Sequence, residues 1–203
     1  MKGLLLKDII NLKSQGKVMA ALLMFYIFLA LSSNNNAMFG GIVSVIAAIL
    51  PITALSFDEK ARWDKYALSM PVSRTDMVIS KYLLGFLLLG CAFLINMLFN
   101  IFASTDTIKE VFILAYILLA IGLVFLSLVL PILFKFGVEK GRLFILVILF
   151  LPTAAVIIFS KAGLQKPSEE ALHNLLLVSP FIVIAILVFS ILVSLKIYSK
   201  KEM

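Results

Sequence analysis

The chain has 203 residues, of which 63% are hydrophobic and only 14% are charged. Soluble domains are near half apolar and a quarter charged, so this composition excludes an ordinary soluble domain. The net charge of +7 does not require a nucleic-acid partner, because basic residues gather beside membrane spans on one side of a bilayer. The sequence predicts an all-α membrane protein with a single transmembrane domain over residues 1–203.

The first segment, residues 1–17, is predicted to contain an amphipathic helix over residues 3–16. Leu5, Ile9 and Leu12 recur at helical spacing on one face, with Leu6 and Ile10 beside them. The opposite face is polar and carries Lys7, Asn11 and Ser14. An apolar stripe backed by lysines is typical of a helix that lies on a lipid surface, so membrane lipid is an expected partner.

Six later segments are long and apolar enough to cross a bilayer core, which takes roughly 20 residues per helix. They lie near residues 18–34, 37–57, 82–103, 111–134, 143–160 and 174–195. An even number of spans places both termini on the same side. We expect Cys91, the only cysteine, to be a small core residue of the third span.

The distribution of basic residues sets the expected orientation. With the N-terminus in the cytoplasm, only Lys109, Lys161 and Lys166 of the 18 basic residues fall on the outer side. Both termini and the segment between spans 2 and 3 are therefore expected inside.

That segment, residues 58–81, is a charged insert in an otherwise apolar chain. It holds the only tryptophan, Trp63. Trp63, Tyr66, Ala67 and Met70 are spaced as one apolar, aromatic helix face. The opposite face is expected to carry Asp58, Arg62, Lys65 and Ser69.

Pro71 is expected to end this helix, because proline lacks a backbone donor and disfavours helical geometry at Met70. Ser73, with Asp76 three residues on, is expected to cap the helix that runs into span 3. Two interpretations of the insert remain open. Its aromatic residues suit either anchoring at lipid headgroups or docking into a groove on a soluble partner.

The middles of the spans contain no ionisable residue, which argues against a proton- or sodium-driven pump. Asn96 and Asn100 lie on one face of span 3. They either line a transport path or form hydrogen bonds between helices. No metal site is expected, because nothing completes one around His173, the only histidine.

The layout and the insert together resemble permease subunits of ABC-2 type transporters. The residues that carry the resemblance form the strings Phe57-Asp58-Glu59-Lys60, Trp63, Leu68 to Arg74, and Lys81-Tyr82. They are similar to a small bacterial branch that includes exporters of phenol-soluble modulins and permeases for lantibiotic and bacitracin immunity. Members commonly have Leu at the position of Met70.

The resemblance implies that the basic first segment is an elbow helix and that the insert is a cytoplasmic coupling helix, which docks on a separate ATPase subunit. The implied docking residues are Asp58, Glu59, Arg62, Trp63, Tyr66, Met70, Pro71 and Arg74. The sequence contains no Gly-x-x-x-x-Gly-Lys-Ser/Thr phosphate loop, so ATP and Mg²⁺ are expected on the partner and this chain is not expected to be an enzyme. A second permease copy or paralogue is also expected.

The predicted function is therefore that of a permease in the bacterial cytoplasmic membrane. It would be the membrane subunit of an ATP-driven exporter of amphipathic or hydrophobic cargo, such as membrane-active peptides or antimicrobials. The alternative is a non-transporting membrane scaffold or sensor whose insert binds another protein. Cargo, direction of transport, and homodimer versus heterodimer stay open.

Overall fold

The structure is a computed structural model that describes residues 2–33, 36–67, 72–103, 107–161 and 169–200. Within these ranges every regular element is an α-helix, as the composition predicts, because a helix satisfies its own backbone hydrogen bonds inside a bilayer. The helices are α1 (Lys2–Lys13), α2 (Gly16–Ser33), α3 (Asn36–Lys60), α4 (Trp63–Ala67), α5 (Arg74–Ala103), α6 (Ile108–Lys161) and α7 (Glu169–Ser199).

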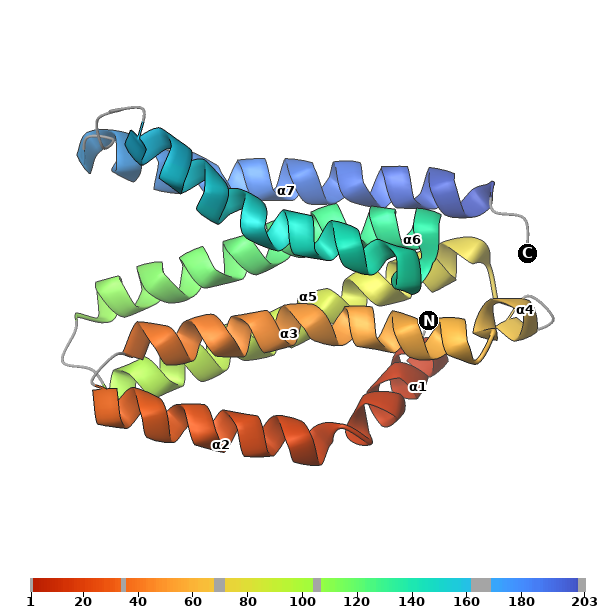
Figure 1. The fold of residues 1–203 in the computed structure, drawn as a ribbon, viewed down its shortest axis with the longest axis horizontal. Helices are drawn as coiled ribbons and strands as arrows, with labels where there is room; N and C mark the ends of the chain where they lie inside the picture. The colour runs from red at the N-terminus through yellow and green to blue at the C-terminus, as the bar shows by residue number, and fades with distance from the viewer. Residues whose placement is uncertain (1, 34–35, 68–71, 104–106, 162–168, 201–203) are drawn as a thin grey trace.

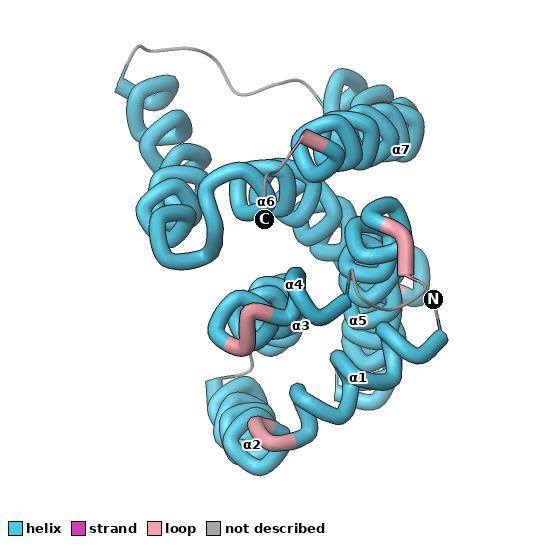
Figure 2. Tube along the Cα trace, turned by 90° about the vertical axis from the view of Figure 1, so that its right-hand side faces the viewer, coloured by secondary structure: helices cyan, strands magenta, loops and turns pink. Residues whose placement is uncertain are grey.

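The long helices form an elongated bundle with α3, α5 and α6 at its centre. α3 packs against both α5 and α6, and α7 packs against α6 and α5. α2 and α7 lie on opposite flanks of the bundle (Figures 1 and 2). The short helices α1 and α4 lie at one end, together with the C-terminal end of α7 (Figure 1). We call this the insert end.

α6 is not one straight helix. Its 54 residues would span about 80 Å if straight, more than twice the thickness of a bilayer core. Gly137 interrupts it with φ 79° and ψ 168°, and the chain turns back there (Figure 1). α6 therefore consists of a first arm and a second arm joined at Gly137, at the insert end.

Several of the helices are long and apolar enough to cross a membrane. Among the described residues four qualify, namely Met38–Lys60, Arg74–Ala103, Ile108–Phe150 and Asn174–Ser199. The pair α1 and α2, bent by 65°, makes a fifth if it is counted as one span. The chain is therefore a multi-pass membrane protein.

The core between these helices depends on close backbone approach. The largest buried cluster includes Phe39 of α3, Leu89 of α5 and Leu126 of α6. A Cβ atom added to Gly122 would lie 2.6 Å from the Leu89 side chain, so this crossing of α5 and α6 accepts only glycine without rearrangement. Small residues allow such crossings in membrane bundles, where dispersion contacts replace the hydrophobic effect.

α1 directs much of its apolar stripe away from the bundle, as a helix that lies on a lipid surface would. Leu4 and Asp8 are its buried residues, whereas Leu6, Ile9 and Ile10 are 59%, 51% and 58% exposed. The expected helix thus exists, and its apolar face is directed outward, where the sequence predicts lipid. Its polar side contacts the protein through Lys7 and Asp8, and the sequence did not predict this contact.

Cys91 is exposed on α5, so the prediction of a core position is wrong. The buried side of α5 runs through Gly85, Leu89, Ala92 and Asn96, at intervals of three and four residues. Cys91 lies off this row.

Candidate functional site

The insert has a different backbone from the expected single helix over residues 58–70. α3 continues through Asp58 to Lys60 and then breaks. Arg62 has φ 50°, a left-handed conformation that ends the helix, and α4 restarts at Trp63. The prediction of continuous helix faces across residues 58–70 is therefore wrong, because the side chains on either side of Arg62 do not share one helix axis.

The break also separates residues that were expected on one face. Tyr66 is 63% exposed, whereas its neighbour Ala67 is fully buried. Arg62 is exposed at the break. Met70 and Pro71, and with them the predicted helix end, lie outside the described residues. Arg62 and Tyr66 are therefore docking candidates that lie on the surface at the break and on α4, which we call the tip of the insert.

The predicted cap of α5 is confirmed. Ser73 Oγ accepts a hydrogen bond from the Asp76 backbone N–H at 3.1 Å, and the Asp76 carboxylate accepts one from the Ser73 N–H at 3.3 Å. Each side chain satisfies a backbone donor that the helix start leaves free. This cap fixes where α5 begins within the insert.

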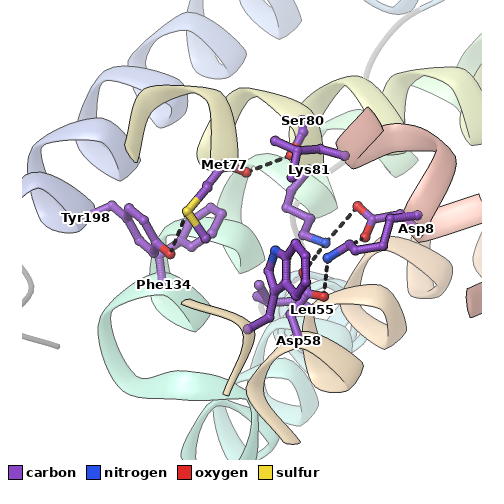
Figure 3. Close-up of a pocket in the computed structure, with 11 residues that line it drawn as sticks. Asp8, Leu55, Asp58, Met77, Ser80, Lys81, Phe134 and Tyr198 are labelled. Atoms are coloured by element: carbon purple, nitrogen blue, oxygen red, sulfur yellow. Dashed lines mark hydrogen bonds and ion pairs between the residues drawn. The ribbon is translucent and has the colours of Figure 1, made fainter. Parts of the chain in front are cut away.

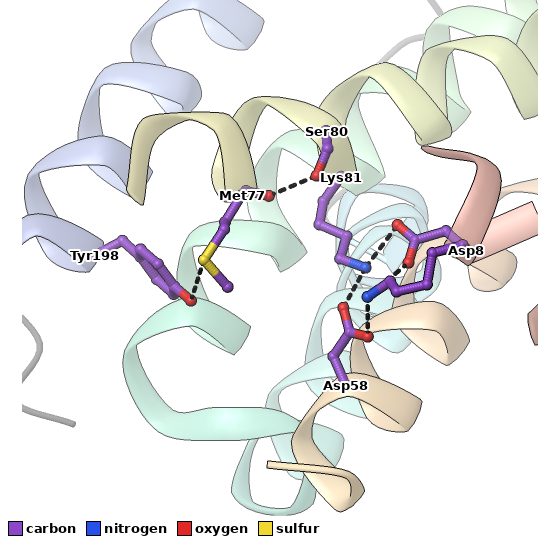
Figure 4. A network of polar contacts seen from close by, with 7 residues as sticks. Asp8, Asp58, Met77, Ser80, Lys81 and Tyr198 are labelled. Atoms are coloured by element: carbon purple, nitrogen blue, oxygen red, sulfur yellow. Dashed lines mark hydrogen bonds and ion pairs between the residues drawn. The ribbon is translucent and has the colours of Figure 1, made fainter. Parts of the chain in front are cut away.

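The strongest feature of the insert end is a closed ring of four ion pairs. Its members are Lys7 and Asp8 of α1, Asp58 of α3 and Lys81 of α5. Lys81 Nζ lies 2.7 Å from Asp8 Oδ2 and 2.6 Å from Asp58 Oδ2, and Lys7 Nζ lies 3.2 Å from Asp8 Oδ1. Lys7 also pairs with Asp58. Figures 3 and 4 show the Lys81 side chain directed between the two carboxylates.

The ring is buried, and its charges balance. The side chains of Asp8, Lys81 and Asp58 are 1%, 5% and 7% exposed, and that of Lys7 is 21% exposed. Removing such charges from water is costly unless every one is paired. In the alternating ring each lysine touches both carboxylates, so the arrangement requires all three helices at once. The ring therefore specifies where α1 sits on α3 and α5.

Trp63 is attached to the same ring. Lys7 Nζ lies 4.4 Å from the centre of the Trp63 ring, within the range of a cation–π interaction. Trp63 also packs against a buried cluster that includes Ala67, Tyr82 and Phe134. The tryptophan is therefore a half-buried contact between α1 and the bundle rather than a fully presented surface residue.

Glu59 joins the insert to the bend in α6. Its Oε2 accepts a hydrogen bond from the backbone N–H of Val138 at 2.6 Å. A Cβ atom on Gly137 would lie 2.5 Å from Glu59 Oε1, so there is no room for a side chain at the bend. The φ of 79° also favours glycine at this position. The Glu59 carboxylate thus caps the start of the second arm.

Arg74 joins the insert to the end of α7. Its guanidinium donates to the backbone oxygens of Ser199 at 2.7 Å and Tyr198 at 3.4 Å. A cation at a helix C-terminus stabilises the free carbonyls there. The Tyr198 ring contacts Phe134 edge-on with centres 5.5 Å apart, and its hydroxyl lies 3.7 Å from the Met77 sulfur (Figure 3). The insert is thereby connected to α7.

Farther along, a hydroxyl cluster joins α5 to α7 and α6. The Tyr82 hydroxyl shares hydrogen bonds with Ser190 at 2.6 Å and with Ser194 at 2.7 Å. Ser190 Oγ in turn donates to the carbonyl oxygen of Ser127 in the first arm of α6. The spacing of Ser190 and Ser194 places both on one face of α7, which is the sequence signal for this cluster.

Asn96 and Asn100 belong to the contact between α3 and α5. Asn96 is 1% exposed, and its Nδ2 donates to the Gly40 carbonyl at 3.2 Å and to Ser44 Oγ at 3.1 Å. Asn100 is 3% exposed and donates to the Asn96 carbonyl at 2.9 Å. Within this chain the pair therefore forms hydrogen bonds between and within helices.

The predicted docking residues thus divide by position. Arg62 and Tyr66 are exposed, and Glu59 is exposed but holds the α6 bend. Asp58, Trp63 and Arg74 are engaged with α1, α5 and α7. The role of Asp8 in the ring was not predicted, although the sequence contains one signal for it. Asp8 is the only acidic residue before Asp58 and lies in an otherwise basic and apolar helix.

Comparison with known proteins identifies the family. Residues 3–199 match the model of a family described as ABC-2 family transporter protein. A search of curated proteins and a search of solved structures each returned no match. The family model covers nearly the whole chain, including the insert and all seven described helices. The protein therefore belongs to the ABC-2 transporter family, as a membrane subunit of the kind that in general works with an ABC ATPase.

Proposed function

We propose that the chain is the permease subunit of an ATP-driven exporter and that a separate ATPase subunit docks on the insert. The observation that carries this proposal is the connectivity of the insert. Through Asp58, Glu59 and Arg74 it bonds to α1, α5, the bend of α6 and the end of α7, while Tyr66 stays exposed at its tip. A partner that moves the tip would therefore move four helices together.

The proposed membrane arrangement uses six crossings. α2, α3, α5, the two arms of α6, and α7 each cross once, and α1 lies along the surface as an elbow helix. The insert end carries most of the basic residues, which favours the cytoplasm for that end and for both termini. The docking surface then faces the compartment that contains ATP.

The proposed docking surface is centred on Arg62 and Tyr66. Arginine and tyrosine contribute disproportionately to protein interfaces, because each combines a large apolar area with a polar group. Asp58, Trp63 and Arg74 support this surface from behind, and Glu59 connects it to the second arm. Met70 and Pro71 would complete it from the connection between α4 and α5.

The cargo proposed is amphipathic or hydrophobic, such as membrane-active peptides or antimicrobials. An apolar cavity of about 220 Å³ lies between α3 and the two arms of α6. No charged side chain lines it, and its walls include Val45, Ile121 and Leu149. Such a lining suits alkyl and aromatic groups and disfavours ions. Two permease chains, identical or paralogous, would together enclose a path.

The test is purification of the chain in mild detergent with assay of bound ATP hydrolysis. We expect ATPase activity to accompany the wild type and the Phe102→Ala variant, whose side chain is 85% exposed on α5. Tyr66→Ala and Arg62→Asn should lose this activity while still inserting in the membrane. Asparagine tolerates the left-handed backbone at position 62, so that variant removes the charge without strain. A wild-type chain that brings no ATPase activity would instead favour the scaffold or sensor.

A further inference from the structure

The outward face of α1 is apolar in its middle and basic at its ends. Leu6, Ile9 and Ile10 are each more than half exposed. Lys2 and Lys13, at the two ends of the helix, lie on the same side and are exposed. A helix that buries its polar face in protein and turns leucine and isoleucine outward fits the boundary between headgroups and acyl chains. Its lysines then reach the headgroups.

The charge of this face has no counterpart in the described part of the chain. Lys2, Lys13 and Lys17 form no ion pair with any described residue. Asp8, the only acidic residue of α1, is directed inward to the ring. The face is therefore an apolar strip with a positive charge at each end, and Lys17 adds a third positive charge just past the bend, in α2. Anionic lipid headgroups over acyl chains have the complementary chemistry.

The inward face of α1 holds the insert. Lys7 and Asp8 complete the ion-pair ring with Asp58 and Lys81, and Lys7 covers Trp63. α1 is also separated from α2 by a 65° bend, where the backbone N–H groups of Ser14 and Gln15 donate to the carbonyl oxygens of Asn11 and Leu12 in a short turn. A short helix between a lipid-facing surface and a buried ring can therefore tilt as one body about this bend.

We propose that α1 is a latch closed by anionic lipid. Lipid of negative charge holds α1 against the membrane, and Lys7 and Asp8 then hold Asp58 and Trp63 in the position that docks the ATPase. In a neutral membrane α1 is held less firmly, the ring opens more often, and the insert loses its support. The charge of the lipid would thus regulate how well the insert docks the ATPase. The effect of this regulation on transport rests on the proposed function.

Trp63 makes the latch measurable without an ATPase or a cargo, because it is the only tryptophan in the chain. The full chain is reconstituted in vesicles of phosphatidylcholine alone or of phosphatidylcholine and phosphatidylglycerol in equal parts. Quenching of tryptophan fluorescence by acrylamide is then measured. We expect clearly stronger quenching in the neutral vesicles, with each lysine on the lipid face changing the balance about fivefold. High salt should raise quenching in the anionic vesicles, because it screens these charges.

Matched variants separate the latch from a general effect of charge. Replacing Lys2, Lys13 and Lys17 by Gln should abolish the lipid dependence. Replacing Lys135, Lys140 and Arg142 by Gln removes as much charge from the same end and should leave the dependence intact. Lys7→Gln, which opens the ring from within, should give strong quenching in both kinds of vesicle.

Three results would overturn the latch. They are equal quenching of the wild type in both vesicles, unchanged lipid dependence after replacement of Lys2, Lys13 and Lys17, or full lipid dependence in Lys7→Gln. These results are independent of the ATPase test. Co-purifying ATPase activity together with lipid-independent quenching would overturn the latch and support the proposed function. Lipid-dependent quenching without co-purifying ATPase activity would support the latch and contradict the proposed function.

Discussion

Replacement of Lys81 by methionine tests the ion-pair ring most sharply. Methionine has an unbranched apolar side chain like the stem of lysine, and it lacks the terminal ammonium group with its charge and hydrogen-bond donors. Lys81 contacts both Asp8 and Asp58, so its loss leaves two buried carboxylates that share the single cation of Lys7. The variant therefore isolates the electrostatic balance of the ring.

The magnitude follows from the burial of the ring. Breaking a buried ion pair by removing one partner costs about 3–5 kcal/mol, because a charge stays buried without compensation. Lys7 remains beside both carboxylates and its side chain is 21% exposed, so we expect the lower limit, about 3 kcal/mol. For a chain of this size that corresponds to a fall in Tm of about 6–12 °C.

The assay is thermal unfolding of the purified chain in detergent, with Lys140→Met as an exposed control at the same end of the bundle. The double variant Lys81→Met with Asp58→Asn restores neutrality around the pair of Lys7 and Asp8. We expect it to recover about 1–3 kcal/mol relative to the sum of the two single changes. A fall in Tm no larger than that of the control, or strict additivity of the two changes, would refute the reasoning.

Three further changes test other contacts in the same unfolding assay, and one of them also uses export. Gly137→Ala should lower the free energy of unfolding by about 1–3 kcal/mol, because the backbone conformation φ 79°, ψ 168° is open only to glycine. Adding Glu59→Ala should recover the part of this loss that comes from the clash between the new Cβ atom and the Glu59 carboxylate. No loss of stability in Gly137→Ala would contradict the bend geometry. Tyr82→Phe should cost about 1–3 kcal/mol, because buried serine hydroxyls lose a partner, and a neutral result would mean that these hydroxyls find other partners. Asn96→Leu should change stability by about 1 kcal/mol or less and leave cargo export intact; lost export at unchanged stability would place Asn96 on the path.

The sequence was sufficient to predict the helices and the cap, because both depend on local patterns. Apolar runs located α2, α3, the two arms of α6 and α7 to within five residues of the predicted spans 18–34, 37–57, 111–134, 143–160 and 174–195, whereas α5 begins at Arg74, well before the predicted span 82–103. Ser73 and Asp76 lie three residues apart, which is the spacing that a capping box needs. Family membership also followed from the layout and the insert.

The ring was not predictable from local pattern, because its members are far apart in the chain. Lys81 and Asp8 are separated by 73 residues, and only the packing of α1 on α5 brings them together. The break at Arg62 was missed for another reason. Neither glycine nor proline lies between Lys60 and Trp63 to signal it. The contact between the polar side of α1 and the bundle was also not predicted, because its partners Asp58 and Lys81 are distant in the sequence.

The most direct test of the central claim is site-specific photo-crosslinking from position 66. In cells that contain all native partners, a photoreactive amino acid replaces Tyr66, which is exposed on α4. A control variant carries the same amino acid in place of Phe102. We expect position 66 to capture an ATPase chain, recognised by a Gly-x-x-x-x-Gly-Lys-Ser/Thr phosphate loop, and position 102 to capture no such chain. Capture of no such chain from position 66, in cells where the permease is inserted and stable, would contradict the account.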